Sequence, residues 1–144
     1  KVLMLNSNDY IMRQIHQLTQ VLAKVIAAVV GLKGAGQVQQ VFEITNNMLN
    51  EQLELDLESL LEMNSKEMMQ TLEQKEGMNE ENLERMADLF YSIANTLDEG
   101  YKRSEKMTEL LQRSLDIYTH IEEEGNIYSI DRNHKMQEIK KLLG

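Results

Sequence analysis

The sequence predicts an all-α protein of five to seven helices. Proline is absent from its 144 residues, which removes the strongest breaker of helices. Apolar residues recur three or four positions apart over most of the chain, the spacing of one face of an α-helix. Glycine and capping Ser, Asn and Asp residues fall between these periodic segments. The length favours one domain with a sizeable core.

Composition restricts the function. The chain has no cysteine, which excludes disulfides, thiolate zinc sites and a cysteine nucleophile, and which suits a cytoplasmic location. The net charge is −9. Residues 1–40 carry four basic and one acidic side chain, a net charge of +3, so residues 41–144 carry −12. An acidic protein repels the phosphate backbone, and we therefore expect no nucleic-acid partner.

The first helix is predicted from Asn8 to Val30, followed by a Gly-rich turn. Its apolar residues alternate steps of four and three, which is the seam of a coiled coil. We expect this seam to bind another copy of the chain, and its members are Ile11, Ile15, Leu18, Leu22, Val25 and Val29. A second helix is predicted over residues 37–54, and the short connection favours antiparallel packing of the pair.

The first helix also approaches the length of a membrane span. Polar and charged residues such as Arg13, His16 and Lys24 interrupt it, so a span is disfavoured, as each central charge costs about 2.5–3.5 kcal/mol. Peripheral membrane association through this helix is an alternative. Its polar face carries few basic residues for that role, so burial in a core or dimer seam is the better interpretation.

Short helices are predicted over residues 57–78. Asp56 suits the N-cap of one, and Asn64 suits the N-cap of another, with Glu67 at the spacing of a capping box. Gly77 is expected to end this segment in a left-handed conformation, and Asn79 to cap the next helix. Four methionines surround these helices and fit core filling better than an exposed, adaptable groove: Met63, Met68, Met69 and Met78.

A helical hairpin with a turn at Gly100 is predicted from residue 83 to 121. Its first helix turns Leu83, Met86, Ala87, Phe90, Ile93, Ala94 and Leu97 to one side. Its second helix turns Ser104, Met107, Leu111, Ser114, Tyr118 and Ile121 to one side. The small residues Ala87, Ala94 and Ser114 allow the helices to approach closely. Gly125 ends the second helix, and Ser129 caps a last one.

The hairpin resembles a degenerate tetratricopeptide unit. Phe90, Ile93, Ala94 and Leu97 have the order and spacing of that family's first helix, and Met107, Leu111 and Ser114 follow its second helix with an enlarged first member. With its opening Asn8-Asp-Tyr-Ile-Met-Arg-Gln-Ile15, the whole chain also resembles a small uncharacterised bacterial family of all-helical proteins, sometimes labelled tetratricopeptide-like. The resemblance implies no enzyme, cofactor or catalytic residue.

No arrangement of residues indicates a particular chemistry. The Gly31–Gly36 turn lacks the strand and the Lys-Ser or Lys-Thr of a phosphate loop, and no serine sits in a nucleophile elbow. The nearest approach to a metal or small-molecule site is His120 with Asp131 and His134. We therefore expect no enzyme activity, no cofactor, and no catalytic or metal-binding residue.

The sequence thus predicts one helical domain in three parts. An N-terminal helical pair (1–56) and short helices (57–78) pack on a tetratricopeptide-like hairpin with a C-terminal helix (79–144). The predicted function is noncatalytic protein–protein interaction, either by dimerisation through the first helix or by the hairpin holding a helical peptide. The alternatives are a metal or small-molecule site in the helical bundle and peripheral membrane association.

Overall fold

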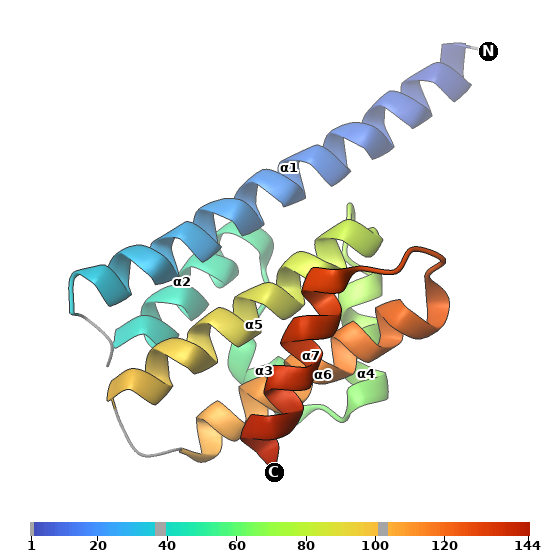
Figure 1. Cartoon of the computed structure of the whole chain (residues 1–144). Helices are drawn as coiled ribbons and strands as arrows, with labels where there is room; N and C mark the ends of the chain where they lie inside the picture. The colour runs from blue at the N-terminus through green and yellow to red at the C-terminus, as the bar shows by residue number, and fades with distance from the viewer. Residues whose placement is uncertain (1, 37–39, 101–103) are drawn as a thin grey trace.

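The computed structural model describes residues 2–36, 40–100 and 104–144, with side chains for 8–36, 40–97 and 104–144. Within these ranges the elements are all α-helices and there is no strand, which confirms the predicted fold class. Figure 1 shows the seven helices described, which are α1 (Val2–Gly34), α2 (Val41–Leu53), α3 (Leu57–Glu62), α4 (Ser65–Glu73), α5 (Glu80–Gly100), α6 (Glu105–Glu124) and α7 (Ile130–Leu143).

α1 is longer than the sequence predicts. It begins at Val2 instead of after Asn8, and it continues to Gly34 instead of ending at Val30. The segment before Asn8 contains neither glycine nor proline, so nothing in it stops the helix, and Asn8 is an ordinary helical residue instead of a cap. With 33 residues, α1 is about 50 Å long. Its N-terminal part extends beyond the other helices (Figure 1).

The rest of α1 packs against α5 and α2. α2 returns beside α1 after the connection, as the predicted antiparallel pair requires (Figure 1). The predicted start of the second helix at residue 37 lies outside the described residues. α2 ends at Leu53, where Glu54 adopts a left-handed conformation (φ 55°) and its backbone N–H reaches Asn50 O.

The caps of the two short helices confirm the sequence predictions. The Asp56 carboxylate accepts a hydrogen bond from the Ser59 backbone N–H over 3.0 Å at the start of α3. The Asn64 side chain accepts one from the Glu67 N–H over 2.9 Å at the start of α4. Asn46 of α2 donates to Asp56 Oδ1 over 2.9 Å, so the α3 cap is also tied to α2.

The α5–α6 hairpin forms the centre of the core. Both inward faces are buried, including Phe90 and Ile93 on α5 and Met107 and Leu111 on α6. Ser114 Oγ donates a hydrogen bond to Ala87 O over 2.8 Å, which requires the two helices to approach closely there. The predicted role of small residues in this hairpin is therefore confirmed at Ala87 and Ser114.

Two details of the hairpin differ from the prediction. Ser104 is exposed and is the N-cap of α6, where its hydroxyl accepts from the Met107 N–H, so it does not belong to the inward face. Serine at this position satisfies an unpaired amide of the first helical turn, which overrides the periodicity. Gly100 is the last residue of α5, and the turn that follows at 101–103 lies outside the described residues.

α7 is held to the hairpin by charged groups as well as by Met136 and Ile139. Its Arg132 side chain is only 4% exposed and donates to Glu84 of α5 over 2.6 Å and to Glu122 of α6 over 2.7 Å. Burial lowers the pKa of Arg132, but these two carboxylates raise it above the ordinary value. The charge is thus paired on two sides, as a buried ion must be.

The four central methionines fill the core. Met68 and Met69 are buried, and Met63 and Met78 are partly buried against the same cluster. The structure therefore favours core filling over an exposed methionine surface.

Candidate interaction surface

The six residues of the predicted α1 seam divide into two groups. Leu18, Leu22, Val25 and Val29 are buried inside the chain's own core. Ile15 is partly buried, and Ile11 is 54% exposed. The four buried residues are therefore covered by α5 and α2 and are not accessible to a partner in this conformation. The part of the seam left for another molecule begins at Ile15 and runs toward the N-terminus.

A polar cluster marks the point where the body of the protein stops covering α1. Asn82 of α5 is fully buried, and its side chain donates to Ile15 O over 3.2 Å and to Gly77 O over 2.7 Å. Thr19 of α1 donates to Asn82 Oδ1 over 2.7 Å. Gly77 lies so close that a Cβ there would be 2.5 Å from Gln14 O. The α4–α5 connection therefore clamps α1 at residues 14–19.

On the N-terminal side of residue 14, one hydrogen bond from α1 to another part of the chain is described. Tyr10 Oη donates to Glu76 Oε2 over 3.0 Å, and this hydrogen bond raises the pKa of Tyr10 above its ordinary value. We name residues 2–13 of α1 the projecting segment. Figure 1 shows it leaving the bundle at the end where α5 starts and where α6 connects to α7.

Exposed apolar side chains concentrate at that same end. Among the residues with described side chains, seven large hydrophobic ones are exposed, and six of them lie in the projecting segment or in the α6–α7 connection and the first residue of α7. They are Tyr10, Ile11, Met12, Ile127, Tyr128 and Ile130, and the seventh is Val30. Gly125, which precedes the α6–α7 connection, packs against Glu80 at the start of α5. These exposed residues thus belong to two separate elements, α1 and the connection that leads into α7.

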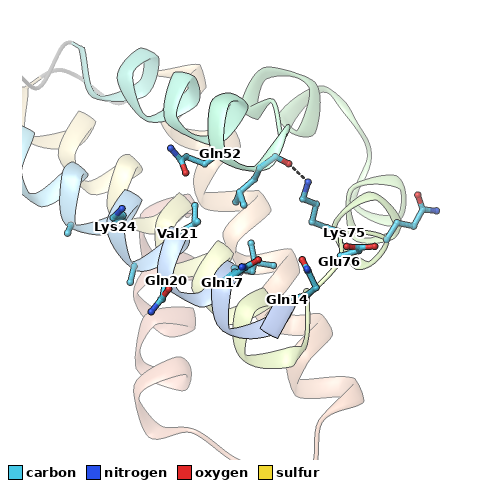
Figure 2. Close-up of a pocket in the computed structure, with 13 residues that line it drawn as sticks. Gln14, Gln17, Gln20, Val21, Lys24, Gln52, Lys75 and Glu76 are labelled. Carbon is cyan, nitrogen blue, oxygen red and sulfur yellow. Dashed lines mark hydrogen bonds between the residues drawn. The ribbon is translucent and has the colours of Figure 1, made fainter. Parts of the chain in front are cut away.

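A groove of about 1060 Å³ begins next to the projecting segment (Figure 2). It follows α1 from Gln14 to Ala27, and its opposite wall is formed by Gln52 and Leu53 of α2 and by residues 74–76. The Lys75 ammonium donates to Leu53 O, which joins the two parts of that wall. The groove is therefore built from three separate parts of the chain that are fixed to one another.

The lining of the groove is apolar at its base and rich in amides at its rim. Leu18, Val21 and Leu53 supply apolar surface, and α1 contributes the side-chain amides of Gln14, Gln17 and Gln20. Side-chain amides both donate and accept hydrogen bonds but are not acid–base catalysts. The lining also includes three charged side chains, those of Lys24, Lys75 and Glu76.

The residues of the predicted metal alternative have separate partners. His120 Nε2 lies 3.5 Å from Glu73, Asp131 pairs with Lys135 at 3.1 Å, and His134 lies 3.9 Å from Glu138. No group of three or more metal-ligating side chains is found among the described residues. The structure does not bring His120, Asp131 and His134 together as a site.

The residues that carry the tetratricopeptide resemblance serve the chain's own core. On α5 and α6 they are buried, apart from Leu97, which is partly buried. A helical peptide held by the hairpin would therefore contact other residues of α5 and α6.

A second charged cluster lies between α5, α6 and α7. Asp88 Oδ1 accepts from Tyr118 Oη over 2.5 Å and from Lys135 Nζ over 3.1 Å. Burial, together with the nearby Asp88 carboxylate, raises the pKa of Tyr118 far above its ordinary value. Burial lowers the pKa of Lys135, but Asp88 and Asp131 raise it above the ordinary value. All these groups are paired within the chain, so the cluster holds α7 in place.

By length and composition, α1 from Asn8 to Gly34 is apolar enough to cross a membrane. In the 18-residue window that meets this criterion, 22% of the residues are buried inside the fold. The buried residues of this helix belong to the core. Among the described residues, no other helix meets the same criterion. The same composition is found in core helices of soluble proteins, so the observation by itself selects no location.

Comparison with known proteins found no relative of this chain. No family model, curated protein or solved structure matches the chain. The resemblance to a tetratricopeptide unit therefore stays a prediction carried by the residues of the hairpin.

Sequence reasoning missed two parts of this surface. Ile127, Tyr128 and Ile130 lie in a short connection and at the start of α7, where no helical periodicity drew attention to them. Residues 14–27 of α1, 52–53 of α2 and 74–76 form the groove only after folding. The cluster of glutamines on one side of α1 was the available signal, because amides at this spacing share a helix face.

Proposed function

We propose that this protein is a noncatalytic interaction module that associates with a second copy of itself through the projecting segment of α1. The observation that carries the proposal is the exposure of Ile11 on a seam whose later members are buried. The same 3.5-residue repeat therefore serves the core of one chain and then continues past it. Such a repeat is typical of a helix that packs on another helix.

The described side chains of the projecting segment have little tertiary packing, since residues 8–13 are all exposed. In proteins, most of the stability of a helix comes from the packing of its apolar face. Within one chain, its described tertiary contact is the Tyr10–Glu76 hydrogen bond. Packing against another helix would supply the missing burial of Ile11 and Met12.

The charge distribution does not oppose a second copy. The projecting segment contains one acidic and one basic residue, Asp9 and Arg13, so its net charge is zero. It therefore meets no net repulsion from residues 41–144 of another copy, which carry −12. An anionic membrane would repel that acidic body.

Two matched substitutions on α1 test the proposal. Ile11→Glu places a charge on the projecting segment, and Val30→Glu places the same charge on an exposed position near the other end of the helix. We expect size-exclusion chromatography with light scattering to show that Ile11→Glu is a folded monomer and that Val30→Glu keeps the dimer. Equal behaviour of the two variants and the parent chain would remove the proposed role of the projecting segment.

Peripheral membrane binding is the second candidate, favoured by the apolar character of α1. Flotation with vesicles of neutral and of anionic lipid tests it directly. Retention of the protein in the lipid fraction, lost in Ile11→Glu, would favour the membrane over a second copy. The self-association proposal expects no flotation with either lipid.

A further inference from the structure

We infer that the projecting segment of each copy packs against the end of the other copy where α6 connects to α7. The residues that receive it are Ile127, Tyr128 and Ile130, which we name the connection cluster. This inference rests on the proposed self-association and adds the surface that meets Ile11 of the second copy.

The connection cluster is the most exposed apolar part of the chain that the structure describes. Its three side chains are 64–79% exposed, more than any other large hydrophobic residue whose side chain is described. Outside this cluster and the projecting segment, Val30 is the one exposed large hydrophobic residue among the described side chains. An apolar helix of a second copy therefore finds its largest apolar surface at the connection cluster.

The backbone beneath the cluster is held in one conformation by the body of the protein. The buried guanidinium of Arg132 donates to Ile127 O over 2.8 Å, and Ser129 Oγ accepts from the Arg132 backbone N–H over 3.1 Å. Gly125, at the start of the connection, packs against Glu80 of α5. A surface that is already fixed loses little conformational freedom on binding, which favours association.

Ile11 lies on the side of α1 that a second body can approach. It precedes Leu18 by seven residues and Leu22 by eleven, so it shares the helix face that packs on the body in its own chain. Asp9 and Arg13 are each two positions away from Ile11, about 200° around the helix. The face that carries Ile11 is therefore uncharged, and packing it against the connection cluster buries no charge of the segment.

The projecting segment and the α6–α7 connection lie at the same end of the molecule (Figure 1). A two-fold axis at this end brings each segment to the connection cluster of the other copy, so two equal contacts form together and the pair is closed. If the two features lay at opposite ends, the same contact would build an open chain of copies.

The apolar area of the two features is that of a stable dimer. At about 200 Å² for a whole residue of this size, the six exposed residues of the segment and the cluster present roughly 800 Å² per copy. A specific interface buries about 800 Å² per partner. Neither feature reaches this area alone, so a stable dimer needs both.

Charge complementation tests whether Ile11 and Ile130 meet. Ile11→Glu introduces an acid on the segment, and Ile130→Lys introduces a base on the cluster, both at exposed positions. We expect sedimentation equilibrium to show that each variant alone has a dimer dissociation constant raised about tenfold or more. An equimolar mixture forms pairs with one unchanged contact and one contact between the introduced charges. We expect it to associate about fivefold or more tightly than either variant alone.

Val30→Lys is the matched control. It places the same charge on an exposed apolar residue outside both features, and it should dimerise as the parent chain does. Circular dichroism checks that every variant is folded. Ile127→Lys replaces Ile130→Lys in the same experiment if the latter does not fold.

The outcomes separate the two proposals. If Ile11→Glu is monomeric and Ile130→Lys dimerises as the parent chain does, the placement is overturned and self-association stands. Two monomeric variants whose mixture also stays monomeric overturn the placement as well, because residues 11 and 130 then do not meet. A monomeric parent chain at every concentration overturns both proposals.

Discussion

The phenol of Tyr118 donates a hydrogen bond to the carboxylate of Asp88 across the α5–α6 interface, with 2.5 Å between the two oxygens. Lys135 of α7 approaches the same carboxylate oxygen, at 3.1 Å. Three helices therefore meet at one charged group, close to the buried Arg132. Because the pKa values of Tyr118 and Lys135 are both raised in the folded protein, this cluster makes folding depend on pH in the alkaline range.

The first prediction concerns this alkaline range. Tyr118 and Lys135 both hold their protons more tightly in the folded chain than in the unfolded one. Their contribution to stability is therefore complete below the unfolded-state pKa values, about 10 for tyrosine and 10.4 for lysine, and is lost as the pH rises above them. We expect the urea midpoint to be constant from pH 7 to 9 and to fall between pH 10 and 11.

Tyr118→Phe is the matched variant. It removes the titrating phenol and keeps the ring, so the fall above pH 10 should become shallower but persist through Lys135. At pH 7 the variant should lose about 1.5–3 kcal/mol of unfolding free energy, because a hydrogen bond to a charged group disappears. An unchanged pH dependence in Tyr118→Phe would contradict the assignment of the effect to this hydrogen bond.

The second prediction compares two glycines. Gly77 has φ +85° and lies against the backbone of α1, so a Cβ there would meet Gln14 O at 2.5 Å. Gly31 lies within α1, and a Cβ there would meet nothing within 4 Å. We expect Gly77→Ala to destabilise the protein by more than about 1 kcal/mol and Gly31→Ala to stabilise it by about 0.5–1 kcal/mol. Thermal unfolding followed by circular dichroism measures both, and stabilisation by Gly77→Ala would contradict the close contact.

The third prediction concerns Asn82, the buried side chain that joins α5 to α1 and to the α4–α5 connection. Asn82→Ala removes the hydrogen bonds to Ile15 O and Gly77 O, but Ile15 O still accepts from the Thr19 hydroxyl and Gly77 O from the Asn79 N–H, so we expect a loss of about 0.5–1.5 kcal/mol for each hydrogen bond removed. Hydrogen exchange should accelerate first in residues 10–20 of α1. Asn47→Ala, at an exposed position of α2, is the control and should change neither quantity. Uniform acceleration over all helices would argue against a local clamp.

The fourth prediction separates the two halves of the α1 seam. Leu22 is fully buried, so Leu22→Glu places a charge in the core and should cost about 4 kcal/mol or more, enough to unfold much of the protein. Ile11→Glu should change the unfolding free energy of the monomer by less than about 0.5 kcal/mol, as is usual at an exposed site. The far-ultraviolet circular dichroism of both variants checks this. Retained helical structure in Leu22→Glu would contradict the packing of α1 on the body.

The helix caps could be predicted because they depend on neighbouring residues. Asp56, Asn64 and Ser129 each accept from a backbone N–H three residues later, and that spacing is visible in the sequence. Periodicity likewise identified the buried faces of α5 and α6, because a helix repeats its face every 3.6 residues. Ser104 shows the limit of prediction from periodicity. Its spacing predicts an inward position, but in the structure it is the exposed N-cap of α6.

Local spacing could not predict how much of α1 is buried by the rest of the chain. The extent of this burial depends on Gly77 and Asn82, more than 60 residues away in the sequence, and on where the α4–α5 connection folds back. The seam from Ile11 to Val29 looks uniform as a pattern, yet one end is exposed and the other is in the core. Which residues face a partner is therefore a property of the tertiary structure.

Sedimentation equilibrium of the unmodified protein over a wide concentration range tests the central claim most directly. Self-association through α1 predicts that the apparent mass rises with concentration to twice the 16.7 kDa of the chain and goes no higher, since a two-fold interface is closed. A mass that stays at 16.7 kDa up to the highest concentration would contradict the account.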